Sequence, residues 1–63
     1  MLDGNRLKRE RQRQTMSTMQ LADLAGLEPH RVVGIEAGLL TADDSDLARL
    51  AEALGLEQDD IRA

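Results

Sequence analysis

Residues 17–38, STMQLADLAGLEPHRVVGIEAG, contain the start and stop signals of two short helices. Ser17 is a preferred N-cap residue, and Gln20 at the third helical position completes a capping box. Gly26 is suited to end this helix in a left-handed conformation. Pro29 fits the first position of a second helix, where its missing N–H is not needed. The segment therefore predicts two helices joined by a short turn, which is the arrangement of a helix-turn-helix.

Three further helical segments flank this pair. Residues 5–14 are rich in Arg, Lys, Glu and Gln, which are good helix formers. Residues 45–54 carry apolar side chains at i, i+3, i+4 and i+7, and residues 58–62 can form a last helical turn. With the second helix of the pair at 29–38, the sequence predicts an all-α fold. We expect a compact bundle of about five short helices that forms one domain over residues 1–63.

The composition excludes several classes of protein. The chain has 63 residues, no cysteine and a single histidine, His30, so neither disulfides nor a structural zinc site can support the fold. It also has no Phe, Tyr or Trp, so the core must be aliphatic. No nucleophile–base constellation or glycine-rich phosphate loop stands out, and so short a chain can hardly enclose a pocket. We expect no enzymatic activity, no metal, no cofactor and no small-molecule substrate.

The sequence also lacks the signals of a membrane or secreted protein. No apolar run approaches the roughly 18 residues that a membrane span needs. The first residues, MLDGNR, lack the apolar region of a signal peptide. We therefore expect a cytoplasmic protein without a membrane partner.

Charge is divided unevenly along the chain, although the net charge is −4. Residues 1–31 hold six basic and four acidic side chains, whereas residues 32–63 hold two basic and eight acidic ones. The basic N-terminal half is suited to contact phosphate while the acidic half points away. Lys8, Arg9 and Arg13 are the candidates for phosphate contact in the first helix. The alternative is that these charged helix faces are only solvated.

The spacing of the apolar, capping and charged residues resembles the Cro/repressor type of helix-turn-helix domain, found in lambdoid phage repressors and small bacterial regulators. The resemblance covers nearly the whole chain, from about residue 6 to residue 61. The matching residues are Leu7, Arg11, Ser17, Leu21, Ala22, Gly26, Leu27, Val32, Ile35, Glu36, Gly38, Leu47, Leu50, Ala51, Leu54, Gly55, Leu56 and Ile61. The resemblance implies a lambda-repressor-like fold. It also implies a sequence-specific transcriptional regulator of repressor type that binds double-stranded DNA as a homodimer, with helix 29–38 in the major groove.

The resemblance implies roles for individual residues. Arg11 and Glu36 are expected to form a structural ion pair, and the alternative or additional role of Arg11 is a contact with phosphate. The start of the second helix is expected to lie against DNA phosphate, since its amides favour an anion. Its residues are Ser17, Thr18 and Met19. The base-contacting positions are Glu28, Pro29, His30, Arg31, Val33 and Gly34, and Arg31 is the strongest of them because its guanidinium can pair with guanine. The alternatives are that Ser17 and Thr18 only cap their helix, and that His30 only faces solvent.

The loop after the third helix departs from the family pattern. Relatives commonly place basic residues there, whereas this chain has Leu39 and Leu40. These leucines are either tucked under the fourth helix or exposed as a partner or dimer surface. Asp44 and Asp46 also stand where relatives often have apolar residues, so we expect few phosphate contacts and a shallow salt dependence. The alternative function is a protein-binding module, such as an anti-repressor or the small partner of a larger regulator.

Overall fold

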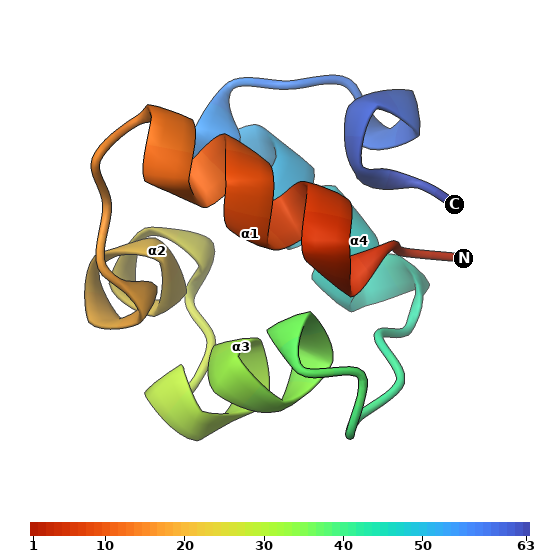
Figure 1. The fold of residues 1–63 in the computed structure, drawn as a ribbon, viewed down its shortest axis with the longest axis horizontal. Coiled ribbons are helices and arrows are strands. Elements are labelled where there is room, and N and C mark those ends of the chain that lie inside the picture. Colours follow the sequence, from red (N-terminus) through yellow and green to blue (C-terminus); the bar gives the residue numbers. More distant parts are fainter.

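The computed structural model describes all 63 residues and contains four α-helices and one 3₁₀ turn (Figure 1). The elements are α1 (Gly4–Arg13), α2 (Thr18–Ala25), α3 (Pro29–Glu36), α4 (Asp44–Leu54) and η1 (Gln58–Ile61). This architecture confirms the predicted all-α bundle. No helix is both long enough and apolar enough to cross a membrane.

The signals at the ends of α2 act as predicted. The Ser17 hydroxyl accepts a hydrogen bond from the Gln20 amide at 3.0 Å, and the Gln20 side-chain oxygen accepts one from the Ser17 amide at 2.8 Å. At the other end, Gly26 has a φ of +70°, a left-handed conformation that costs glycine little. Pro29 opens α3 directly after the turn. The capping box therefore fixes where α2 begins, and Gly26 fixes where the chain turns towards α3.

Several helix boundaries differ from those predicted. Helix α1 spans Gly4–Arg13, one residue earlier than predicted, because Asp3 serves as its N-cap, and η1 ends at Ile61, one residue early. Helix α3 ends at Glu36 and not at Gly38, because the amides of Leu39 and Leu40 both donate to the Gly34 carbonyl, at 2.8 and 3.1 Å. Helix α4 begins at Asp44, one residue early, because Asp43 serves as its N-cap. The changes at the end of α3 and at the start of α4 arise from hydrogen bonds that cap these helix ends. They move each boundary by one or two residues.

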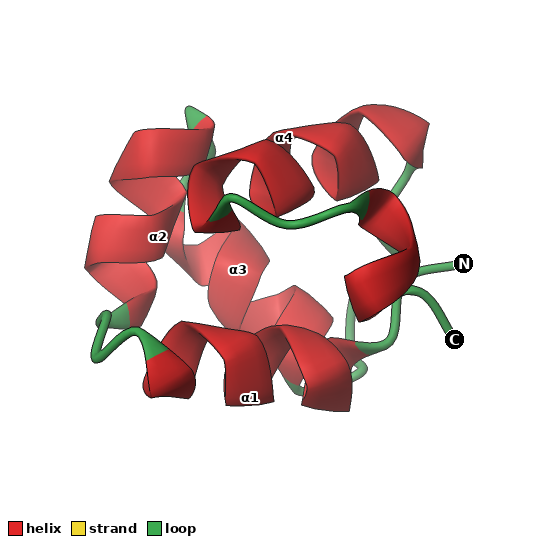
Figure 2. Ribbon diagram, turned by 90° about the horizontal axis from the view of Figure 1, so that it is seen from above, coloured by secondary structure: helices red, strands yellow, loops and turns green.

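The core is aliphatic, as expected from the composition. Figure 2 shows α1 and α4 on opposite sides of the bundle, with α2 at one end and η1 at the other. Each of the five elements contributes at least one buried side chain to a single cluster. Its members are Leu7, Leu21, Ala22, Ala25, Val32, Ile35, Leu47, Leu50, Ala51, Leu54 and Ile61. Burial of this cluster holds α2 and α3 in a fixed relative orientation.

The two ends of the chain lie side by side (Figure 1) and are tied together by the backbone. The Asp3 amide donates to the Ile61 carbonyl at 2.8 Å, and the Ala63 amide donates to the Met1 carbonyl at 2.7 Å. Next to this tie, Gly4 lies so close to the end of α3 that an added Cβ would stand 2.9 Å from the Glu36 carbonyl oxygen. The absence of a side chain at Gly4 therefore permits the close contact of α1 with α3.

Candidate nucleic-acid interface

Helix α3 has one buried and one exposed face. Val32, Gly34 and Ile35 are buried, whereas the 3.6-residue period turns His30 and Val33 outward. Four of the six predicted base-contacting residues are exposed, and they lie at the start and on the outer face of the helix. These are Glu28, Pro29, His30 and Val33. The outer face of α3 is therefore free to meet a partner.

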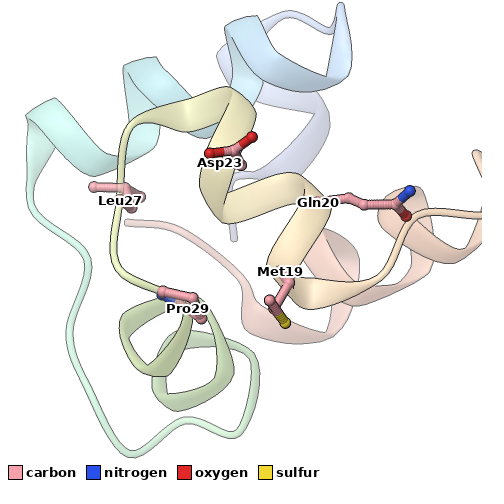
Figure 3. Close-up of a pocket in the computed structure, with 5 residues that line it drawn as sticks. All are labelled: Met19, Gln20, Asp23, Leu27 and Pro29. Atoms are coloured by element: carbon pink, nitrogen blue, oxygen red, sulfur yellow. The ribbon is translucent and has the colours of Figure 1, made fainter.

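A hollow of about 400 Å³ lies between α2 and α3 (Figure 3). Met19, Gln20 and Asp23 line it from α2, and Leu27 and Pro29 line it from the turn and the start of α3. The beginnings of the two helices thus open onto one concave surface. Asp23 places an acidic group there, which disfavours phosphate at that point of the surface.

The start of α2 keeps hydrogen-bond donors available. The Ser17 oxygen accepts from the Gln20 amide, but its hydroxyl proton remains free to donate. The amides of Thr18 and Met19 lie in the first turn, where a helix has no internal acceptors for them. Met19 is exposed and Thr18 is half-buried. The cap and an anion contact are therefore compatible at this helix end.

His30 and Glu28 face each other at the start of α3. His30 Nδ1 lies 3.2 Å from Glu28 Oε2, and both side chains are largely exposed. Solvent screens such a pair, and the side chains separate at little cost. Both residues therefore remain available for contact with a partner.

Arg31 is engaged within the protein, which sequence reasoning missed. Its Nε donates to Asp46 Oδ1 at 3.1 Å, and its Nη2 donates to Asp46 Oδ2. The Arg31 side chain is 34% exposed, whereas that of Asp46 is only 6% exposed. Asp46 also accepts a hydrogen bond from the Asp43 amide at 3.0 Å and donates its own amide to Asp43 Oδ1 at 2.8 Å. Asp46 thus joins the first turn of α3 to the capping box of α4.

The predicted base contact of Gly34 does not fit the structure. Gly34 is buried, and an added Cβ would lie 2.7 Å from Leu40 Cγ. Leu40 therefore covers Gly34 and separates it from a base. Of the two alternatives for the leucines, the structure favours exposure over burial under the fourth helix, because Leu39 is 82% exposed and Leu40, 40% exposed, packs on α3. The two leucines form an exposed apolar patch beside α3.

The basic residues of α1 divide between two sides of the helix. Arg9 and Arg13 line a hollow together with Asp60 of η1, on the side away from α3. Lys8 follows Gly4 by four residues, so it lies on the side that packs towards α3. The contact of Arg9 and Arg13 with phosphate stays a prediction, and their placement disfavours a shared contact with the surface formed by α2 and α3. Lys8 remains a candidate for phosphate contact.

Arg11 and Glu36 form the ion pair that the family resemblance implied. Arg11 Nε lies 2.7 Å from Glu36 Oε2, and Arg11 Nη2 donates to Glu36 Oε1 at 2.9 Å. The third nitrogen, Nη1, donates to the Met16 carbonyl at 2.7 Å, so the guanidinium also holds the turn between α1 and α2. The two side chains are 11% and 7% exposed. The hydrogen bond to Glu36 raises the pKa of Arg11, and Arg11 therefore stays charged.

A family comparison covers nearly the whole chain: the family described as "Helix-turn-helix domain" matches residues 4–63. The chain belongs to the helix-turn-helix domain family. A solved structure with the same fold is that of the restriction-modification controller protein C.AhdI from Aeromonas hydrophila. It is 33% identical, with a TM-score of 0.89, over 90% of this chain and 86% of that one. No curated protein matches the sequence. These findings confirm the resemblance to Cro/repressor-type domains and place the chain among DNA-binding regulators.

The acid stability of this helix-turn-helix domain provides a test of the Arg31–Asp46 pair. The hydrogen bond from Arg31 lowers the pKa of Asp46, burial opposes this effect, and the hydrogen bond from Asp43 adds to the lowering. Because the folded-state pKa lies below the unfolded one, the pair stabilises the fold at neutral pH, and this contribution is lost below about pH 4.

We expect the free energy of unfolding of the wild-type domain to exceed that of Asp46→Asn at pH 7. The difference should shrink as the pH falls below about 4. Urea unfolding of both proteins at several pH values measures it. A difference that stays constant down to pH 2 would contradict a lowered pKa of Asp46.

Proposed function

We propose that this chain is a sequence-specific DNA-binding transcriptional regulator that places α3 in the major groove. The observation that carries the proposal is the outer face of α3, which is exposed while its inner face is fixed in the core next to α2. A helix presented in this way fits the width of the major groove. The family membership and the likeness to C.AhdI, a restriction-modification controller protein, support this function. Domains of this type typically act by binding and not by catalysis.

The charges around α3 favour a contact with few phosphates. Lys8 and the donors at the start of α2 are suited to the DNA backbone, whereas Asp23 and Glu28 repel it. The net charge of −4 adds to this repulsion. Base recognition by α3 must therefore supply a larger part of the binding free energy than in a strongly basic relative.

A dimer fits this mode of binding, because one copy offers one recognition helix and hence one short half-site. The exposed apolar patch formed by Leu39 and Leu40 lies beside α3, and we propose it as the dimer interface between two copies of the chain. Occupation of an operator by such a dimer would block the polymerase, which is the action of a repressor.

The same apolar patch favours a second candidate function, that of a protein-binding module. Leu39 and Leu40 occupy positions where relatives commonly have basic residues that contact the DNA backbone. Val33 adds an exposed apolar side chain on α3 itself. Exposed apolar surface of this kind commonly marks a protein contact. A module of this type would bind a protein partner and ignore DNA.

Selection from a random duplex library, followed by affinity measurements at several salt concentrations, tests the main proposal. We expect one sequence to be enriched. Its affinity should fall by less than about 10³-fold between 50 and 200 mM salt, because fewer than about six phosphates are contacted. Lys8→Gln should weaken binding to all duplexes alike and reduce the salt slope by about 1.

The matched control is Arg9→Gln, which removes a charge from the opposite side of α1 and should leave the slope unchanged. If no duplex is enriched at low salt, the DNA-binding proposal is wrong, and the protein-binding module becomes the better account.

A further inference from the structure

We propose that Asp46 is a positioning residue that holds Arg31 ready to recognise a guanine. Arg31 would then determine specificity for one G·C base pair. This inference rests on the proposed DNA-binding function and adds to it a specific division of roles between α3 and α4.

The hydrogen bonds of Arg31 leave a suitable edge of its guanidinium free. Asp46 occupies Nε and one proton of Nη2, which form one side of the group. Three of the five N–H donors remain, two on Nη1 and one on Nη2. Nη1 has no hydrogen-bond partner within the protein, and about a third of the side chain is exposed. Guanine presents two adjacent acceptors, O6 and N7, which match the free donors on the two terminal nitrogens, Nη1 and Nη2.

Asp46 is built to hold its partner in place. Its carboxylate is buried and accepts from both Arg31 and the Asp43 amide, while its own amide donates to the Asp43 side chain. The capping box of α4 therefore prevents Asp46 from following Arg31 to other rotamers. Because the arginine is already ordered in the free protein, less rotamer freedom is lost when it binds a base.

The charges favour a base over a phosphate as the target of Arg31. Asp46 neutralises the guanidinium, so the pair gains little from a phosphate and would bring a carboxylate close to it. The edge of guanine is neutral, and its recognition depends on the direction of the donors and not on net charge. A buttressed arginine should therefore contribute to specificity and little to the salt dependence.

The test compares the wild-type protein with Asp46→Asn and Arg31→Lys. The asparagine oxygen can still accept from the Asp43 amide, so the cap of α4 is retained. Arg31→Lys leaves Asp46 unchanged but removes the planar fork, and it serves as a second variant if Asp46→Asn does not fold. Affinities are measured for the duplex that the wild-type protein selects and for duplexes in which each G·C pair is replaced in turn.

We expect both variants to lose about 10-fold or more of the discrimination at one and the same G·C pair, with discrimination at other pairs kept. In Asp46→Asn the arginine is released as an unpaired cation, so the salt slope should also steepen by about 1. A merely structural role of Asp46 would lower the affinity for all duplexes alike. The matched control is Asp44→Asn, which removes a neighbouring exposed acid and should keep the discrimination.

Two results would overturn the inference while leaving the proposed function intact. One is unchanged discrimination in both variants. The other is tighter binding by Asp46→Asn with discrimination kept, which would mean that Asp46 holds Arg31 away from DNA. Failure of the wild-type protein to select any duplex would overturn the proposed function itself, and the inference with it.

Discussion

Replacing Arg11 with alanine is expected to lower the free energy of unfolding by about 3–5 kcal/mol, because Glu36 would be left as an uncompensated buried charge. The same change removes the hydrogen bond to the Met16 carbonyl, which fixes the turn into α2. Domains of this size have little stability to lose, so the variant should be largely unfolded at 37 °C. Urea unfolding followed by circular dichroism measures the loss.

Two further variants distinguish a buried ion pair from an ion pair on the surface. Arg13 pairs with Glu10 at 3.1 Å, but the Arg13 side chain is largely exposed, so Arg13→Ala should cost less than about 1 kcal/mol. The double substitution Arg11→Met with Glu36→Leu should be less destabilising than Arg11→Ala alone, because no unpaired charge remains. A loss of under about 1 kcal/mol for Arg11→Ala would show that the pair contributes no more than a surface bridge.

Truncation of Leu50 to alanine is expected to cost about 2–5 kcal/mol. Leu50 is completely buried at the middle of α4, in a cluster that contains no aromatic side chain to fill the space left behind. Removal of its branched end therefore leaves a cavity as well as a loss of buried apolar area. Thermal and urea unfolding of the variant measure the effect.

Leu24→Ala is the matched control, since Leu24 is an exposed leucine on α2. Its substitution should change the free energy of unfolding by no more than about 0.5 kcal/mol. If the two leucine variants lost equal stability, α4 would not pack in the core as described.

The order and approximate bounds of the helices could be predicted because their signals are local. Ser17 and Gln20 stand three residues apart and close a capping box with no help from the rest of the chain. Gly26 similarly ends α2 through its own conformational freedom. The Arg11–Glu36 pair could be predicted only from the family resemblance, because its two residues are 25 positions apart in the sequence.

The organisation of the candidate interface could not be predicted from such signals. Asp46 follows Asp43 at the spacing of a capping box, so its role at the start of α4 was open to prediction from the sequence. Its pairing with Arg31 depends on how α3 packs against α4. The burial of Gly34 depends in the same way on the path of Leu40 after α3. Both features arise from tertiary packing, which single-sequence patterns do not encode.

The most direct test of the DNA-binding proposal is a titration of ¹⁵N-labelled protein with the selected duplex, followed by amide chemical shifts. The account predicts that the largest changes fall at the start of α2, residues 17–20, and along residues 28–33, and that they fade as salt is raised. Changes confined to Leu39, Leu40 and the acidic C-terminal half, with none along α3, would contradict it.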